Sequence, residues 1–141
     1  MKDFIAFEKV GMDADTLILK VTGAATAICA GTWIQVPRTV IQDFQEQIGN
    51  YLLEPEMESY WESDVPGLGT TPCVTLRLLP RKQDGTILTE LFMELDEGSI
   101  FSRHSCCFYV ATTKQALESF AQDIPMLASM SEGERLVLNG D

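Results

Sequence analysis

Residues 73–95 read CVTLRLLPRKQDGTILTELFMEL, two β-prone runs on either side of a polar turn. The runs Cys73 to Pro80 and Thr86 to Leu95 flank a segment with a glycine, so they predict a β-hairpin. A four-residue loop at the turn would place Arg77 opposite Glu90. One face of the hairpin is then apolar and buried. The other is mixed, and is either partly covered or a contact surface; it carries Thr75, Arg77, Leu79, Leu88, Glu90, Phe92 and Glu94.

Further strands are predicted before and after this hairpin. Each is a short run of β-branched and apolar residues, most of them bounded by turn-forming residues. The runs cover residues 4–10, 16–22, 26–36, 59–62, 105–111 and 135–138.

The apolar period changes after Pro37, and this change predicts an amphipathic helix. Its stripe has the i, i+3, i+4, i+7 spacing of one helix face. Pro37 suits a helix start, where its missing N–H is not needed, and Pro55 limits the other end. The stripe comprises Val40, Ile41, Phe44, Ile48, Tyr51 and Leu52.

A second amphipathic helix is predicted near the carboxyl end. Thr112 or Thr113 is a good N-cap, and Thr112 with Gln115 matches the capping-box pattern. Pro125 falls inside the apolar stripe, so the helix is expected to bend or end near residues 123–124. The stripe comprises Ala116, Leu117, Phe120, Ile124 and Leu127.

These elements predict a single α+β domain over residues 1–141. A chain of 141 residues fits one domain with a proper core. The order of elements lacks strict βαβ alternation, which argues against a parallel doubly wound sheet. We expect a mostly antiparallel β-sheet of five to seven strands, with the two amphipathic helices packed on one face.

The two strand–helix junctions resemble each other. Residues 33–36 lead into a helix with Phe44 in its stripe, and residues 108–111 lead into one with Phe120. This similarity indicates either a duplicated unit or two independent solutions to the same amphipathic pattern.

The charge balance restricts the classes of partner. Ten Lys and Arg stand against twenty-one Asp and Glu, giving a formal net charge of −11. Such a field repels phosphate backbones and anionic lipids, so neither nucleic acid nor a membrane is an expected partner. It would steer in a basic protein, or it serves solubility alone. The chain lacks a visible signal peptide, which predicts a cytoplasmic location with reduced thiols.

No catalytic, cofactor-binding or metal-ligating residue is predicted. His104 and Cys106 would point the same way on a strand and Cys107 the opposite way, so one element offers at most two convergent ligands. A zinc site would need Cys29 or Cys73 as well. The spacing therefore favours small buried thiols and an exposed histidine, and the chain is not expected to be an enzyme.

An acidic segment that also carries aromatic residues is the candidate partner-binding site. Tyrosine and tryptophan are the side chains that anchor protein interfaces. The alternative is a solvated loop whose aromatic residues pack into the core. The candidate residues are Glu54, Glu56, Glu58, Tyr60, Trp61, Glu62 and Asp64.

The layout resembles that of small bacterial immunity proteins, which neutralise polymorphic or contact-dependent toxins. The resemblance is architectural and covers most of the chain. It is carried by residues 33–36 with the helix after them, by the acidic segment 54–62, by the 73–95 hairpin, and by the 108–110 strand with its helix. It implies a non-enzymatic inhibitor that occludes the active site of a basic, toxin-like protein.

Two other functions are compatible with the sequence. One is a small-molecule binder or enzyme with a pocket between sheet and helices. The other is a homo-oligomeric structural module that associates through Thr75, Leu79, Leu88 and Phe92. A monomer or a homodimer fits the sequence equally well.

Overall fold

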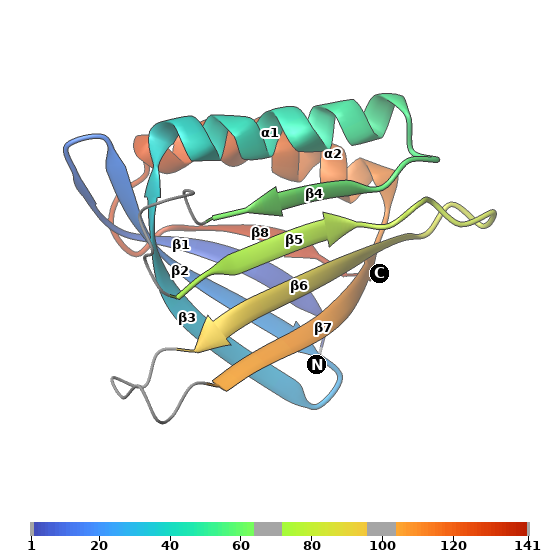
Figure 1. Ribbon diagram of the computed structural model, residues 1–141, viewed down its shortest axis with the longest axis horizontal. Coiled ribbons are helices and arrows are strands. Elements are labelled where there is room, and N and C mark those ends of the chain that lie inside the picture. Colours follow the sequence, from blue (N-terminus) through green and yellow to red (C-terminus); the bar gives the residue numbers. More distant parts are fainter. Residues whose placement is uncertain (1, 64–71, 96–103, 141) are drawn as a thin grey trace.

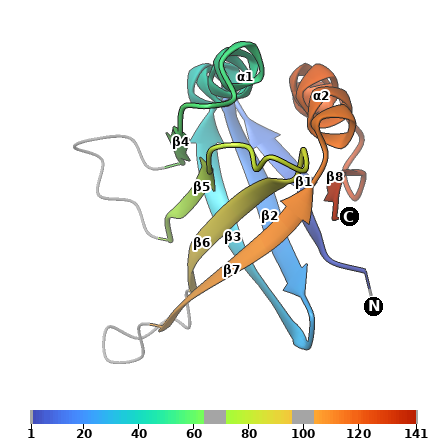
Figure 2. The ribbon, with the colours of Figure 1, turned by 90° about the vertical axis from the view of Figure 1, so that its right-hand side faces the viewer.

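The computed structural model describes residues 2–63, 72–95 and 104–140, and shows two packed antiparallel sheets with two helices (Figures 1 and 2). In chain order the elements are β1 (Phe4–Asp13), β2 (Thr16–Ala25), β3 (Ile28–Pro37), α1 (Arg38–Leu53), β4 (Ser59–Glu62), β5 (Val74–Leu78), β6 (Ile87–Leu95), β7 (His104–Thr112), α2 (Lys114–Asp123), the 3₁₀ helix η1 (Ile124–Ala128) and β8 (Arg135–Asn139).

The strands form two four-stranded sheets, which correct the prediction of one sheet with five to seven strands. Their orders are β3-β2-β1-β8 and β4-β5-β6-β7. The chain leaves the first sheet at Pro37 and enters α1 directly, so β4 starts a new ladder. Local apolar patterns identify strands but do not show which strands share a sheet.

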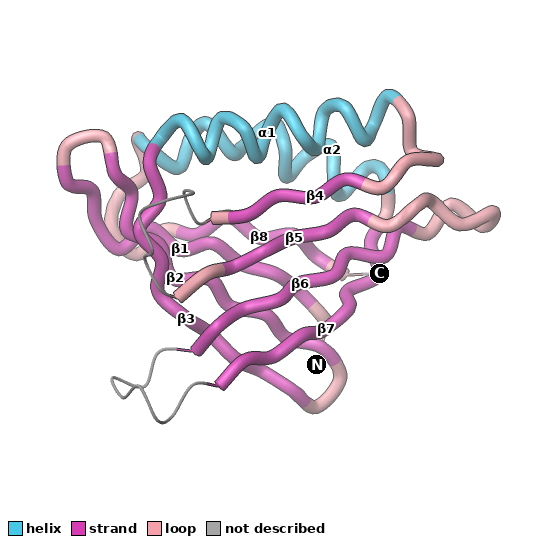
Figure 3. Tube along the Cα trace, viewed as in Figure 1, coloured by secondary structure: helices cyan, strands magenta, loops and turns pink. Residues whose placement is uncertain are grey.

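The helices lie along one end of the molecule, across both sheets (Figures 1 and 3). Helix α1 contacts β4, helix α2 contacts β8, and the two helices contact each other. The expected arrangement, with both helices on one face of one sheet, is therefore not what the structure shows. No helix in residues 2–63, 72–95 and 104–140 is long and apolar enough to cross a membrane.

The hairpin predicted at residues 73–95 is confirmed, including its register. Arg77 pairs with Glu90, and the amide of Lys82 donates to the carbonyl of Thr86 at 2.9 Å. Gly85 has a φ of 89°, a conformation that other residues rarely adopt. The inward side chains are buried, namely Val74, Leu76, Leu78, Leu91 and Met93.

Both predicted helices are present, and the structure decides between the two candidate caps of the second helix. Thr113, not Thr112, caps α2: its hydroxyl accepts from the amide of Ala116 at 3.2 Å. Thr112 is buried in β7 and donates to the carbonyl of Asn139 at 3.0 Å. Helix α2 ends at Asp123, and Pro125 lies in the first turn of η1. The end of the helix near residues 123–124, predicted from Pro125, is therefore confirmed.

The two strand–helix units occupy equivalent places. Strand β3 is an edge strand of one sheet and leads into α1, while β7 is an edge strand of the other sheet and leads towards α2. The rings of Phe44 and Phe120 meet with centroids 6.0 Å apart. Each junction thus follows the edge strand of its own sheet, and both origins of the similarity agree with this arrangement.

An aromatic cluster forms the part of the core below the helices. Trp61 of β4 stacks on Phe44 with centroids 4.2 Å apart, and Phe7 of β1 lies 5.6 Å from Phe44. The indole N–H of Trp61 donates to the carbonyl of Val40 at 3.0 Å. The cluster joins both helices to both sheets, so it stabilises the whole arrangement.

A glycine in β2 lets the two sheets approach closely. Gly23 of β2 lies against Phe108 and Leu91 of the opposite sheet. A Cβ atom at residue 23 would lie 2.7 Å from Cδ2 of Leu91, closer than real Cβ contacts allow. Glycine is therefore required here for sheet-on-sheet packing.

Candidate partner-binding surface

The solvent-facing side of the second sheet carries a row of four paired residues. Tyr60 of β4 pairs with Arg77 of β5, which pairs with Glu90 of β6, which pairs with Tyr109 of β7. Directly opposite residues on antiparallel strands point to the same face. The row therefore places an aromatic ring at each edge and opposite charges between them.

Contacts along this row hold the side chains in place. The guanidinium of Arg77 lies over the ring of Tyr60, 5.9 Å from its centroid. Nε of Arg77 lies 3.2 Å from Oε1 of Glu58 and 3.9 Å from Oε1 of Glu90. The hydroxyl of Tyr109 donates to Oε2 of Glu90 at 2.8 Å. Both exposed tyrosines are thus oriented before any partner arrives.

We call this surface the outer acidic face. It carries four carboxylates and one guanidinium, so it has excess negative charge. Tyr60 and Tyr109 are 45% and 48% exposed. The face comprises Glu58, Tyr60, Glu62, Thr75, Arg77, Glu90, Phe92, Glu94, Cys107 and Tyr109.

The predicted acidic segment contributes three residues to this face. Glu58, Tyr60 and Glu62 lie on it, and the hydroxyl of Tyr60 donates to Glu62 at 3.3 Å. Trp61 is 2% exposed and belongs to the aromatic cluster, so it is a core residue and not a contact residue.

The remaining members of the predicted segment lie elsewhere. Glu54 and Glu56 are exposed on the connection between α1 and β4. Asp64 lies outside the described residues.

Other residues of the face were missed as site residues. The hairpin register did place Arg77, Glu90, Phe92 and Glu94 on one mixed face, which was the available signal. Tyr109 follows from the alternation of β7, where Cys107 and Tyr109 point outward and Phe108 and Val110 point inward. What joins them to Tyr60 is the pairing of β4 with β5, two strands separated by residues 63–73 with no turn pattern that fixes their register.

Hydrogen bonding to Glu90 raises the pKa of Tyr109, because the neutral phenol donates to a carboxylate that opposes the phenolate. Burial is the main cause that raises the pKa of Tyr60, and the charge of Glu62 adds to it. Both phenols therefore stay protonated, and able to donate, to a higher pH than an ordinary tyrosine.

Replacing Glu90 by glutamine is expected to lower the pKa of Tyr109 towards its ordinary value, about 10. The native state holds this proton more tightly than the unfolded chain. The stabilisation is therefore complete below the ordinary tyrosine pKa and is lost as pH rises through the raised value. Tyrosinate absorbance, taken as the difference between each protein and its Tyr109→Phe counterpart, measures the midpoint. Equal midpoints with and without Glu90→Gln would contradict the assignment.

The Cys106 and Cys107 thiols of β7 are less acidic than an ordinary cysteine. Burial raises the pKa of the Cys106 thiol, and burial followed by the charge of Glu90 raises that of Cys107. Raised thiol pKa values lower the thiolate fraction at neutral pH. Across residues 2–63, 72–95 and 104–140, no three His, Cys, Asp or Glu side chains are grouped to hold a metal ion. Cys29, Cys106 and Cys107 are free thiols.

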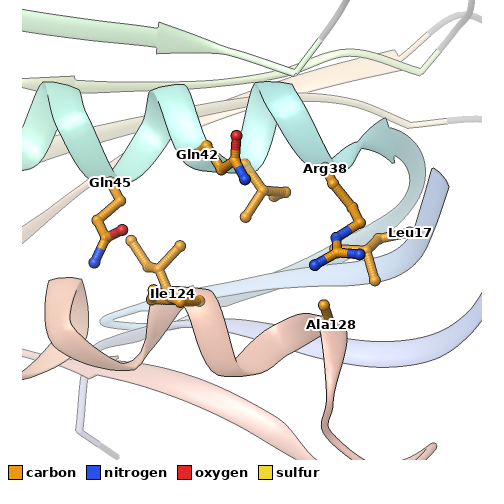
Figure 4. A pocket seen from close by; sticks show the side chains of 8 residues that line it. Leu17, Arg38, Gln42, Gln45, Ile124 and Ala128 are labelled. Carbon is orange, nitrogen blue, oxygen red and sulfur yellow. The ribbon is translucent and has the colours of Figure 1, made fainter. Parts of the chain in front are cut away.

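A separate cleft lies between α1, η1 and the start of β2. Its volume is about 180 Å³. Buried Leu17, Ile41 and Ile124 form apolar walls, and Arg38, Gln42 and Gln45 supply polar groups. Figure 4 shows Gln45 towards one end and Arg38 towards the other. We call it the helix cleft; Pro125 and Ala128 complete its lining.

Comparison with known proteins gives a fold and no family. No family model matches the chain, and no curated protein matches it in sequence. A structure of the plant transcriptional regulator PBF-2 is similar with a TM-score of 0.50 at 12% identity, over 92% of this chain and 79% of that chain. A likeness at this identity shows a shared fold alone.

A more distant structure is the CdiA-CT/CdiI toxin and immunity complex from Enterobacter cloacae. Its TM-score is 0.38 at 11% identity, over 99% of this chain and 90% of that chain. A toxin–immunity complex is thus among the weak structural neighbours, but at this distance it carries no argument about function.

Proposed function

We propose that this chain is a non-enzymatic protein-binding module whose outer acidic face binds a basic protein. The wider hypothesis is a cytoplasmic inhibitor of the immunity or antitoxin type, which occludes a toxin-like partner. That wider hypothesis comes from the architectural resemblance of the sequence, whereas the binding face comes from the described side chains.

The observation that carries the proposal is the fixed pair of exposed tyrosines on the acidic face. Tyrosine offers a large contact area with few rotatable bonds, so little entropy is lost when it is buried in an interface. Here both rings are further restrained, Tyr109 by its hydrogen bond to Glu90 and Tyr60 by Arg77 and Glu62. Such preorganisation lowers the entropic cost of association.

Charge gives this surface a preference among partners. The net charge of −11 attracts basic proteins from a distance, and the carboxylates of Glu58, Glu62, Glu90 and Glu94 direct them to one face. Fast association that weakens steeply with salt is the expected signature. Occlusion requires no chemistry from this chain, because a covered active site is already inhibited.

The decisive test compares two variants with the same net charge. The face variant combines Glu58→Gln, Glu62→Gln and Glu94→Gln. The control variant combines Glu46→Gln, Glu118→Gln and Glu134→Gln, three exposed sites off the face. Each immobilised protein is used to capture partners from a lysate of its source, and native mass spectrometry identifies the complex.

The expected result is a basic protein held by the wild type and by the control, released by salt, and bound about tenfold more weakly by the face variant. Equal weakening by both variants would reduce the effect to net charge and contradict a binding face. A homodimer lost in the face variant would favour the oligomeric alternative, because the partly buried Phe92 lies on the same surface.

A further inference from the structure

The helix cleft has the size of a compact ligand. Its volume of about 180 Å³ is smaller than a drug-sized site but close to the roughly 150 Å³ of an apolar cavity that holds benzene. Its walls include Leu17, Ile41 and Ile124, which are 1%, 4% and 1% exposed, so each is fixed by the core and borders the cleft with only a small part of its side chain. The walls therefore favour one ring or a short branched chain.

The charged side chains in and behind the cleft, Arg38 and Lys9, are cationic, whereas the chain as a whole is acidic. Arg38 reaches into it from the first turn of α1 and forms no ion pair with any residue of the described ranges. No acidic residue is among its lining residues. Behind it, the ammonium of Lys9, itself 7% exposed, donates to the carbonyl of Ala128 at 2.7 Å.

Polar groups beside the apolar walls can complete the recognition of an anion. Arginine binds a carboxylate through two parallel N–H donors. Gln42 is exposed at the rim, and Gln45 donates to the carbonyl of Ala121 at 3.0 Å, which fixes that side of the cleft. A strongly hydrated anion such as phosphate would gain little from the apolar walls, whereas a carboxylate with a compact hydrocarbon group matches both parts.

We propose that the helix cleft binds a small aromatic or branched aliphatic carboxylate of about the size of benzoate. The ring or branch would lie between Leu17, Ile41 and Ile124, and the carboxylate would pair with Arg38. This site is separate from the outer acidic face, so it does not depend on the proposed protein partner.

Benzoate is the first probe, and the matched neutral probe is benzamide. Amide chemical shifts of the whole chain are followed by NMR during titration. Saturable shifts are expected at Leu17, Ile41, Ile124 and Ala128, with benzamide at least about tenfold weaker because it lacks the charge. Shifts that do not saturate, or equal binding of benzamide, would overturn the proposal.

Variants assign the effect to the cleft. Arg38→Gln is expected to weaken benzoate about tenfold. Arg81→Gln, an exposed arginine outside the cleft, is expected to leave binding unchanged. Equal losses in both variants would overturn the assignment. Ala128→Phe fills the cleft and should abolish binding. If this variant does not fold, the comparison of Arg38→Gln with Arg81→Gln tests the assignment by itself.

An N-acylated dipeptide with a C-terminal phenylalanine distinguishes the source of the carboxylate. It carries the same ring and charge at a chain end. Binding weaker than that of benzoate is expected, because the cleft is compact. Tighter binding would assign the cleft to the C-terminus of a protein and overturn the small-molecule proposal.

Discussion

Replacing Trp61 by alanine is expected to lower the free energy of unfolding by about 3–5 kcal/mol. The side chain is 2% exposed, stacks on Phe44 at 4.2 Å and lies 6.3 Å from the ring of Phe7. Alanine would leave a cavity where both helices meet both sheets. It would also leave the carbonyl of Val40 without its indole donor. Equilibrium denaturation by urea measures the loss.

The chain provides a matched control in its other tryptophan. Trp33 of β3 is 53% exposed, and Trp33→Ala is expected to change stability by no more than about 0.5 kcal/mol. This control also leaves Trp61 as the one fluorescent reporter of unfolding. If Trp61→Ala does not fold, Trp61→Phe keeps a ring, loses the hydrogen bond and should show a smaller loss. A cost near that of the control would show that Trp61 is not a core residue.

The contrast between Tyr60 and Trp61 shows which structural feature could not be predicted from the sequence. Adjacent residues on a strand point to opposite faces, so one of the two had to be buried and the other exposed. The segment SYWE does not show which, because both residues are large, amphipathic and flanked by polar neighbours. The register of β4 on β5 decides the question, since Trp61 pairs with inward Leu76 and Tyr60 with outward Arg77.

Elements formed by local patterns were predictable. The 73–95 hairpin and α1 depend on alternation, helical spacing and turn residues within about twenty positions, and all of these are visible in the sequence. The division into two sheets depends on pairings between distant segments, such as β1 with β8. No local pattern of the chain encodes that choice.

The candidate face was predictable in parts. The acidic segment and the mixed face of the hairpin were each visible, but as separate features. The four-strand row from Tyr60 to Tyr109 joins them only in three dimensions. The candidate list from the sequence therefore included residues of this face together with Trp61, which the structure buries in the core.

Replacing Tyr109 by alanine is expected to weaken the complex with the proposed basic partner by about 2 kcal/mol or more, about thirtyfold in Kd. The ring is 48% exposed, stands at the edge of the row and is oriented by its 2.8 Å hydrogen bond to Glu90. Alanine removes the contact area and frees Glu90 from its phenol donor. Isothermal titration calorimetry with the purified partner measures the change.

Three comparisons separate a contact from a folding effect. Tyr109→Phe keeps the ring and should lose only about 1 kcal/mol, the worth of one hydrogen bond. Trp33→Ala removes an aromatic side chain of similar exposure on the other sheet and should leave the Kd unchanged. Urea denaturation of Tyr109→Ala should show near wild-type stability, because the ring lies outside the core. A Kd unchanged in Tyr109→Ala would exclude this edge of the outer acidic face from the interface, and any remaining contact would then centre on Tyr60 and Glu58.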